Sequence, residues 1–579
     1  MYKIMKITKI LTVAAVALGA TVALSGCIRE TFPKESTITK DQLMGGQMDI
    51  VAENLLKGIP CGILAPAAGG WEHTDFGFPS VGVYNDHAAQ LICTNGWTMG
   101  NAPAYNRFYL GSWGKGYGAN GAMPQHIWYT YYPQIKSCND VITLTVDNEK
   151  LASYSAIART YRAYLYLDVA RLFECLPVGG EGNYDETAFE VAGLTAPIVN
   201  EFTKEEAAKN NPRATREEMF TFILDDLKFA EEAFSADYTP TAPTDPTLAV
   251  VYGLYARAYL WLGGFEDGLN GALPSGKEAY AKALEYAQKA IATFGGAIMT
   301  EAEWTNVTTA FNTKASSWMW TLYHSTDTIA GNLHQFVAHM APEASYGYCP
   351  LTNPGVGSKA YERLGDGDFR KKLMIDPNHF DVKYNEELGQ DVLVPNDNAE
   401  ASWNAFKPYT SMTSIDEYKI FAPYTFFKFR PAQGNRTDYM TAGAIAIPLM
   451  RCEEMYFIQM EATYHTQGAD AAMQQLAQFM SNRDSAYSIK TQDILDEIIF
   501  QKGIEFWGEG QIMYDMKRLN MGVNCAYEGT NYDPQRRFNS ETRLPWWTPM
   551  IPMGETQVNL GIPANENNPD PTNVVEPLQ

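Results

Sequence analysis

The stretch LAVVYGLYARAYLWLG, residues 248–263, and the stretch YAKALEYAQKAIATFG, residues 280–295, decide the fold of this chain. In the first, small Ala256 precedes Tyr259 by one helical turn, and Gly263-Gly264 ends the run. The second keeps its apolar side chains on one stripe at the spacing of an amphipathic helix: Tyr280, Ala283, Leu284, Ala287, Ala290 and Ile291. Small residues opposite aromatic ones let two helices approach closely, so the pair is expected to pack antiparallel.

This helix pair resembles a tetratricopeptide unit with an inserted loop from Glu266 to Lys277. One unit cannot bury its own apolar face, so neighbouring helices are expected. Helical patterns predict them at 41–56, 123–141, 151–173, 215–234, 448–466, 469–480, 491–508 and 511–519. Thr215 and Glu218 form the sequence signature of a capping box. The prediction is a mainly α fold: a tetratricopeptide-like helical repeat array, with its scaffold at about 123–294 and C-terminal helices within 448–520.

Two regions break this regularity. Residues 58–125 are rich in Gly, Asn, Trp and Tyr with little periodicity, which predicts ordered loops because disordered segments carry few aromatic residues. Residues 295–445 scatter Gly, Pro and Asn among short apolar pieces such as SSWMWTLYH. There we expect loops, short strands and short helices packed on the array as a loop-rich, irregular binding region. The tail from Asn565 is expected to be extended.

The pattern of the first 27 residues is typical of a targeting segment. Lys3, Lys6 and Lys9 precede an apolar run that ends in Leu24-Ser25-Gly26-Cys27, which resembles a bacterial lipobox. This predicts a signal peptide at 1–26, lipidation of Cys27, and a polar tether at 27–40. No later run reaches the roughly 18 apolar residues that a membrane helix needs. The mature protein is therefore expected to be anchored to a membrane and not to span it.

Composition excludes several classes of function. The net charge of −23 argues against binding nucleic acid, whose phosphates would repel this surface. Seven cysteines remain beyond Cys27, without any Cys-x-x-Cys spacing, so free thiols are favoured over zinc or disulfides. Gly271 to Lys277 nearly spells a phosphate loop, but Glu278 stands where Ser or Thr should be. Ser80 lacks the Gly-x-Ser-x-Gly frame of a hydrolase.

Acidic residues give two further candidates. Asp366 and Asp368 in GDGDF would suit calcium, but two carboxylates do not make a calcium loop, and a turn is favoured. Arginines and carboxylates at helical spacing within 451–461 and 505–518 allow general acid–base catalysis. With so many acidic residues in the chain, we favour ion pairs between helices, no enzymatic activity and no cofactor.

Three segments resemble the SusD/RagB family of bacterial nutrient-binding outer-membrane lipoproteins. Residues 158–178, ARTYRAYLYLDVARLFECLPV, look like its aromatic-rich helix that ends in proline. RCEEMYFIQMEATYH matches its Arg-x-x-Glu-aromatic helix through Arg451, Glu454, Tyr456, Glu461 and Ala462. IIFQKGIEFWGEGQIMYDMKRLN matches a third segment through Glu505, Phe506, Gly508, Glu509, Gly510, Asp515 and Arg518. Gln501-Lys502 departs from the family's usual Glu-Arg, which puts one expected ion pair in doubt.

The resemblance implies one SusD-like domain over residues 41–579 and a loop-rich binding face. It implies a cell-surface lipoprotein, lipid-anchored in the outer membrane, that captures an oligosaccharide and delivers it to a SusC-like TonB-dependent transporter. Peptide capture by the same face stays open as the alternative. A secreted glycan hydrolase and a scaffold that holds another protein are two further hypotheses from other classes.

Aromatic residues in the irregular regions are the candidate ligand-binding residues, since flat rings stack on the apolar faces of sugars. The first set, with Asn101, Asp75 and Arg107 as hydrogen-bonding partners, is Trp71, Trp97, Tyr105, Trp113 and Tyr117. The second set is Trp304, Trp318, Trp320, Tyr323 and Tyr346. In the family, loops of these two regions meet at the ligand site. The alternative for each residue is that its ring is buried and pins its own loop.

Overall fold

The computed structural model describes residues 48–67, 73, 75–94, 116–146, 148–179, 183–234, 238–265, 273–387, 390–572, 574–575 and 578. The chain divides into two units, residues 1–54 and 55–579. Of the first unit, only residues 48–54 belong to the described part, and they form the start of helix α3 (Met48–Leu64). The remaining description concerns the second unit. Among the described residues, no helix is both long and apolar enough to cross a membrane.

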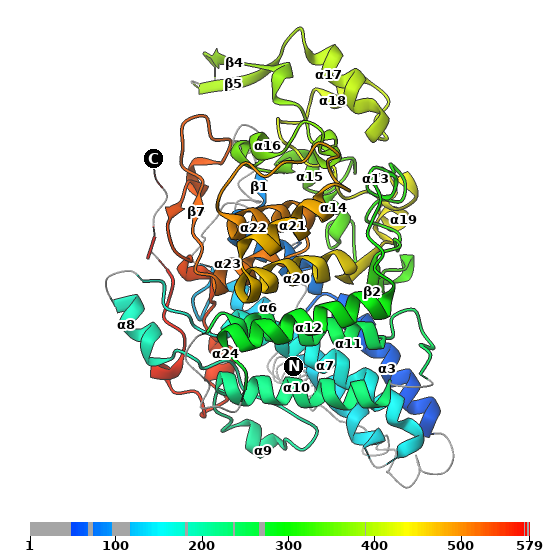
Figure 1. The fold of residues 1–579 in the computed structure, drawn as a ribbon, viewed down its shortest axis with the longest axis vertical. Helices are drawn as coiled ribbons and strands as arrows, with labels where there is room; N and C mark the ends of the chain where they lie inside the picture. The colour runs from blue at the N-terminus through cyan, green and yellow to red at the C-terminus, as the bar shows by residue number, and fades with distance from the viewer. Residues whose placement is uncertain are drawn as a thin grey trace, which may run out of the picture. The chain divides into compact units, whose positions relative to one another are not determined.

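The scaffold is a stack of antiparallel helices. Its N-terminal members are α6 (Ala122–Thr145), α7 (Ala152–Phe173), α10 (Arg216–Ala233), α11 (Leu248–Gly263) and α12 (Gly276–Phe294). Each packs on the next, so that α7 lies between α6 and α10, and α11 between α10 and α12 (Figure 1). The predicted helical array is therefore confirmed.

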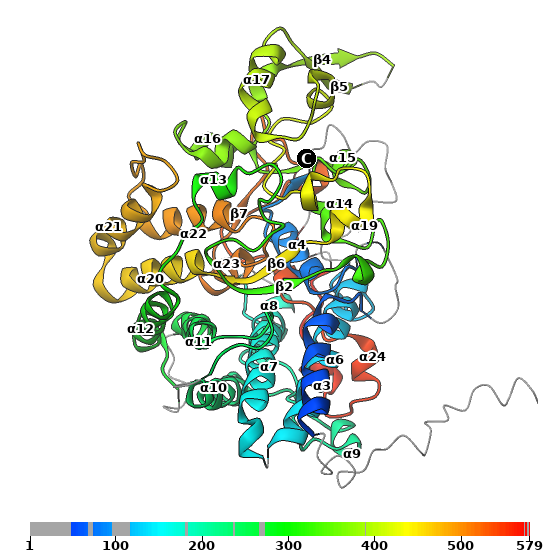
Figure 2. The same cartoon turned by 90° about the vertical axis from the view of Figure 1, so that its right-hand side faces the viewer.

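The array continues with helices from the far end of the sequence. These are α20 (Cys452–Gln467), α21 (Ala469–Met480), α22 (Ile494–Glu505) and α23 (Ile512–Arg518). Helix α12 packs directly on α20, and α20 packs on both α21 and α22, as Figure 2 shows from the side. The irregular region between α12 and α20 is thus an insertion into one continuous stack.

Aromatic stacking holds the central pair α11 and α12 together. The ring of Tyr286 stacks on that of Tyr255, with centroids 4.4 Å apart, and lies 5.7 Å from that of Tyr259. A Cβ at Gly263 would come within 2.7 Å of the Tyr280 ring, so only glycine fits there. The small residues predicted on this stripe, Ala283 and Ala287 among them, are fully buried.

The capping box is also confirmed. Thr215 accepts from the backbone N–H of Glu218, and the Glu218 carboxylate accepts from the backbone N–H of Thr215. Two orphan donors at the first turn of α10 are satisfied in this way, which fixes where the helix begins.

Short elements make up the rest. The helices are α4 (Phe78–Ala88), α8 (Asn183–Glu190), α9 (Glu205–Ala208), α13 (Glu301–Trp304), α14 (Phe336–Met340), α15 (Cys349–Thr352), α16 (Ser358–Arg363), α17 (Ala399–Phe406), α18 (Ile415–Tyr418), α19 (Tyr439–Gly443) and α24 (Met553–Thr556). The strands form antiparallel pairs: β1 (Cys93–Thr94) with β3 (Pro354–Gly355), β2 (Trp318–Tyr323) with β6 (Ala446–Arg451), β4 (Phe380–Asn385) with β5 (Gln390–Pro395), and β7 (Val523–Asn524) with β8 (Asn539–Ser540).

Two sequence predictions are wrong in detail. Residues 58–125 were expected to be loops, yet α3 extends to Leu64 and α4 occupies 78–88. Helix α4 escapes a pattern search because nine of its eleven residues are buried, so it has no polar face. The helix expected from Pro448 begins instead at Cys452, because 446–451 pairs with β2 as strand β6.

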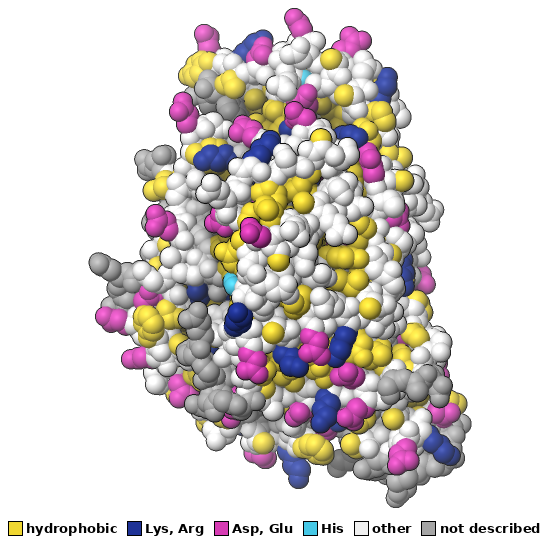
Figure 3. Space-filling model, in the orientation of Figure 1, with side chains coloured by type: hydrophobic (Ala, Val, Ile, Leu, Met, Phe, Trp, Pro, Cys, Tyr) yellow, Lys and Arg dark blue, Asp and Glu magenta, His cyan; other side chains and the backbone are white. Residues whose placement is uncertain are grey.

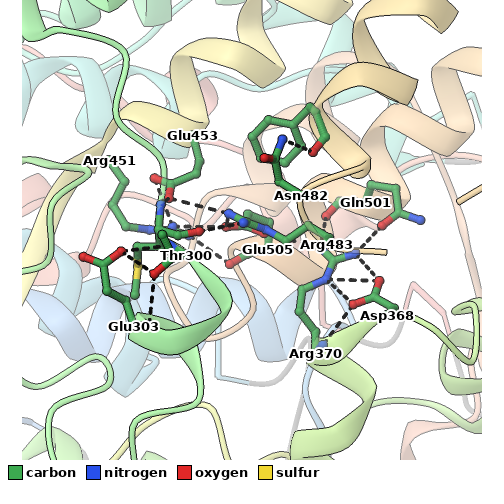
Figure 4. A network of polar contacts seen from close by, with 12 residues as sticks. Thr300, Glu303, Asp368, Arg370, Arg451, Glu453, Asn482, Arg483, Gln501 and Glu505 are labelled. Atoms are coloured by element: carbon green, nitrogen blue, oxygen red, sulfur yellow. Dashed lines mark hydrogen bonds and ion pairs between the residues drawn. The ribbon is translucent and has the colours of Figure 1, made fainter. Parts of the chain in front are cut away.

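A buried charge network joins the insertion to the stack (Figure 4). At its centre, Glu505 accepts from Arg483 at 2.9 and 3.0 Å and from Arg451 at 3.2 Å. Four cations face four carboxylates, so the formal charges cancel: Arg370, Lys428, Arg451 and Arg483 against Asp368, Glu453, Glu505 and Glu509. Burial alone would raise the pKa of Glu505, but the Arg483 and Arg451 guanidinium groups hold it well below its usual range.

The matching motif residues are thus structural, as predicted. Glu454 pairs with Arg257 at 2.6 Å, and Arg518 joins Glu461 to Asp515. Lys502, at the position that departs from the family pattern, still forms an ion pair with Asp515 at 2.7 Å. Asp368, one of the two candidate calcium ligands, forms a buried ion pair with Arg370.

The cysteines of the described region are free thiols, and all but Cys61 are buried. Burial raises the pKa of Cys452 to about 12 and that of Cys175 to about 11. These thiols are neutral and unreactive, as the sequence predicted.

Candidate functional site

The two irregular regions meet at one place, as the resemblance implied. His73 belongs to the first region, and α14, α15 and α19 belong to the second; Figure 2 shows these three helices close together. His73 Nδ1 is hydrogen-bonded to the hydroxyl of Tyr348, and its ring meets that of His334 edge-on at 5.2 Å. His339 donates from Nε2 to the backbone carbonyl of His73 at 2.9 Å.

From His334 the surface continues along neighbouring aromatic residues. The Tyr346 hydroxyl donates to the amide oxygen of Gln335, and the Gln335 amide donates to the backbone carbonyl of Tyr439. The rings of Tyr346 and Tyr439 lie 6.4 Å apart at a steep angle. His73 and Tyr439 are exposed, while His334 and Tyr346 are half-buried. We call these four residues (His73, His334, Tyr346 and Tyr439) the His–Tyr surface.

Buried residues fix the base of this surface. The Phe76 ring stacks on that of His339 with centroids 4.6 Å apart, and Phe76 also contacts Phe336 edge-on. Burial lowers the pKa of His339 to about 4, so the ring is neutral at neutral pH. A neutral His339 donates one hydrogen bond and fills an apolar position, which suits a supporting role.

Asp75, His126 and Ser80 lie in a row beneath the first region, an arrangement that invites comparison with a hydrolase triad. Ser80 Oγ donates to the Gly77 carbonyl at 2.5 Å, so the contact of 2.7 Å with His126 Nε2 has the histidine as donor. In a catalytic triad the serine donates to the histidine. Ser80 is also fully buried. The row therefore supports the turn at residues 75–80 and offers no accessible nucleophile.

Asp75 was a candidate for hydrogen bonding to a ligand, and this prediction is wrong. The carboxylate is buried and accepts from the backbone N–H groups of Ala67 and Gly77, at 2.9 and 3.3 Å. Asp75 therefore shapes the backbone next to His73 instead of facing solvent.

Several predicted site residues lie outside the described residues. They are Trp71, Trp97, Asn101, Tyr105, Arg107 and Trp113 in the first region, and the lipidation site Cys27. Their proposed roles stay predictions.

Trp304, Trp318, Trp320 and Tyr117 were predicted to contact ligand, and the structure corrects this. The three tryptophans are buried to 1% exposure or less, and Tyr117 is buried as well. Trp320 donates from its indole N–H to the Thr244 carbonyl at 2.8 Å and packs against Tyr161 at 4.7 Å. Trp304 packs edge-on against Phe311, close to the buried charge network. Neither ring presents a face to a ligand.

Tyr323 differs from these tryptophans. It is 37% exposed at the end of β2, opposite Ala446, just beyond the end of α19. Its exposed ring and its place beside α19 keep it as a candidate at the edge of the His–Tyr surface. Tyr346 of the same predicted set is part of the surface itself.

Sequence reasoning missed His73, His334 and Tyr439. A usable signal was present for the histidines, because His73, His334 and His339 are three of only eight in the chain, and two of them lie within the seven-residue segment LHQFVAH. Tyr439 had no such signal, since it is one of 34 tyrosines.

Two family models match the sequence of this chain. A family model described as "Starch-binding associating with outer membrane" matches residues 99–260, and one described as "SusD family" matches residues 361–565. The chain belongs to the SusD/RagB family. The first match spans α6, α7, α10 and most of α11, and the second contains every member of the charge network. No curated protein matches the sequence.

Solved structures agree on the fold of this SusD family member. A SusD-like carbohydrate binding protein from Bacteroides vulgatus is 19% identical, with a TM-score of 0.62 over 89% of this chain and 97% of that one. A SusD superfamily protein from Bacteroides thetaiotaomicron is 18% identical, with a TM-score of 0.59 over 90% and 99%. Surface glycan-binding protein A from Bacteroides thetaiotaomicron, in complex with laminarihexaose, is 16% identical, with a TM-score of 0.56 over 90% and 99%.

Proposed function

We propose that this protein captures an oligosaccharide at the cell surface, on the His–Tyr surface, and passes it to a SusC-like TonB-dependent transporter without chemical change. The observation that carries the proposal is the meeting of the two irregular regions at His73 and His334. Two similar structures, a SusD-like carbohydrate binding protein and a surface glycan-binding protein in complex with laminarihexaose, give it further support.

The chemistry of the surface suits a sugar. Tyr439 offers an exposed ring next to a second phenol, and His73 and His334 add imidazole edges that donate or accept hydrogen bonds. Phenol and imidazole groups combine an apolar body with a polar tip, which matches the apolar faces and hydroxyl rims of a pyranose ring. The fixed neutral His339 beneath them reduces the conformational entropy lost on binding.

A ligand screen tests the proposal directly. Calorimetry of the full chain against β-glucan, α-glucan and mannan oligosaccharides is expected to find one class that binds, while a panel of peptides of similar size does not. Binding of peptides alone would support the peptide-capture alternative. New reducing ends after incubation with a bound glycan would instead identify a hydrolase.

The substitution Tyr439→Ala tests whether the glycan binds at the His–Tyr surface. Loss of an exposed stacking ring is expected to weaken glycan binding about tenfold, equivalent to about 1.4 kcal/mol, with little change in thermal stability. Tyr384→Ala is the matched control, because Tyr384 is 65% exposed in the β4–β5 hairpin and lies outside the surface. Equal affinities of the two variants would remove the His–Tyr surface from the site.

Anchoring through Cys27 is part of the same proposal, supported by the lipobox-like Leu24-Ser25-Gly26-Cys27. Cys27→Ala is expected to yield a folded protein without lipid, because no other cysteine follows a lipobox-like segment. Metabolic labelling with a fatty-acid analogue measures this. Continued labelling of the variant, with its signal removed, would place the lipid elsewhere.

A further inference from the structure

A second pocket lies apart from the His–Tyr surface, between α16, α22, α23 and strand β7. Its volume is about 360 Å³, within the range of about 300–1,000 Å³ typical of small-molecule sites. Helix α4 connects the two places, since it begins at Phe78 next to the His–Tyr surface and is followed by Ala89–Leu91 at the pocket. Eleven helical residues span about 16 Å, so the two sites are separate.

Apolar side chains line the floor of this pocket. Its main contributors are Leu91, Ile499, Phe500, Ile504, Met516 and Val523. Figure 3 shows hydrophobic side chains gathered on this face over α22 and below α16. A sugar bound there would lose water from its hydroxyl groups without gaining partners from these side chains, which costs free energy. The pocket therefore selects an apolar body and not a glycan.

Two cations of the rim, Lys359 and Arg363, come from α16, and the rim also holds the carboxylate of Asp496 from α22. Arg363 is already paired with Asp496 and Glu497, at 2.7 and 2.5 Å, and its guanidinium group covers the Phe500 ring. Lys359 is different, because its ammonium group lies 4.0 Å from the centre of the Tyr527 ring. Within the described part of the chain, no carboxylate forms an ion pair with Lys359. Lys359 is thus a cation without a carboxylate partner among the described residues, at the mouth of an apolar pocket.

We propose that this pocket binds a small apolar carboxylate, a medium-chain alkyl or aryl acid, with its body on the hydrocarbon floor and its carboxylate at Lys359. The ammonium group of Lys359 is available to pair with the carboxylate of the ligand, and the Tyr527 ring beneath it holds the ammonium in place. Tyr527 is itself held, because its hydroxyl is hydrogen-bonded to the Ser358 hydroxyl at 2.9 Å. The site is independent of glycan capture.

Titration of the full chain with decanoate, below its micelle concentration, tests the proposal. We expect one decanoate per chain and tighter binding than decan-1-ol, which has the same body without the charge. Lys359→Gln should weaken decanoate about tenfold and leave decan-1-ol unchanged, and Lys359→Arg should restore decanoate. Lys289→Gln is the matched control, because Lys289 also lies over a tyrosine ring, on the helical array.

Ala360→Trp gives a second, steric test, since Ala360 lines the pocket from α16. The new ring is expected to abolish binding of both decanoate and decan-1-ol while the melting temperature and glycan binding stay unchanged. Decanoate binding that survives both Lys359→Gln and Ala360→Trp would place the ligand elsewhere. Equal affinity for decanoate and decan-1-ol would overturn the role of the carboxylate, and absence of any binding at millimolar decanoate would overturn the proposal.

Discussion

Polar side chains have opposite roles in the buried charge network and in the His–Tyr surface: in the first they are buried in ion pairs, and in the second they stay accessible to a ligand. In the network, each guanidinium group is surrounded by carboxylates at distances near 3 Å and excluded from water. At the His–Tyr surface, Gln335 donates to the backbone carbonyl of Tyr439, and the Tyr439 side chain is exposed beside the ring of Tyr346. The first arrangement fixes the fold at the cost of any contact with a ligand, whereas the second leaves ring faces available.

Removal of the central carboxylate is the strongest test of this contrast. Glu505→Ala leaves Arg451 and Arg483 with uncompensated charge in a dry interior, which should reduce the free energy of unfolding by about 3–5 kcal/mol. Glu301→Ala breaks only the exposed pair with Lys372 and should cost less than about 1 kcal/mol. Chemical denaturation measures both. Similar midpoints for the two variants would mean that the network does not stabilise the fold.

Trp320→Ala separates burial from recognition at an aromatic residue. A fully buried indole replaced by alanine leaves a cavity against Tyr161 and Tyr164, and such a change costs about 3–5 kcal/mol of stability. Glycan affinity of the folded fraction should stay at the wild-type value, in contrast to Tyr439→Ala. A variant with normal melting behaviour and lost affinity would return Trp320 to the ligand site.

The smallest effect is expected at the base of the His–Tyr surface and depends on pH. The folded-state pKa of His339 is about 4, whereas an unfolded histidine has a pKa of about 6.5. The unfolded state therefore takes up the proton first, so His339 supports stability above pH 6.5 and this support is lost as pH falls toward 4. His339→Gln keeps an N–H donor for the His73 carbonyl without titrating. Its stability should decline less between pH 6.5 and 4.5, and identical profiles would contradict this role.

Sequence patterns correctly predicted helices that have one apolar face and one polar face. Helices α10 and α12 carry an apolar stripe, and α10 has a cap at Thr215, so their places followed from spacing. Helix α4 and strand β2 are buried on both faces, so their patterns could not show which residues face solvent. Trp320 was assigned to the ligand for this reason. His73 and His334 meet only through tertiary structure, because 261 positions separate them and no local pattern records such a contact.

The charge network also constrains the order in which the chain can become stable. Its members are spread from Asp368 to Glu509, and Glu505 and Glu509 are the last of them to be synthesised. A nascent chain that ends before Glu505 has all four cations but only two of the four carboxylates. Burying those arginines early would leave charges unpaired, which is strongly unfavourable. The packing of the insertion on α20 and α22 therefore waits for Glu505 and Glu509, and this part of the native structure is completed late in synthesis.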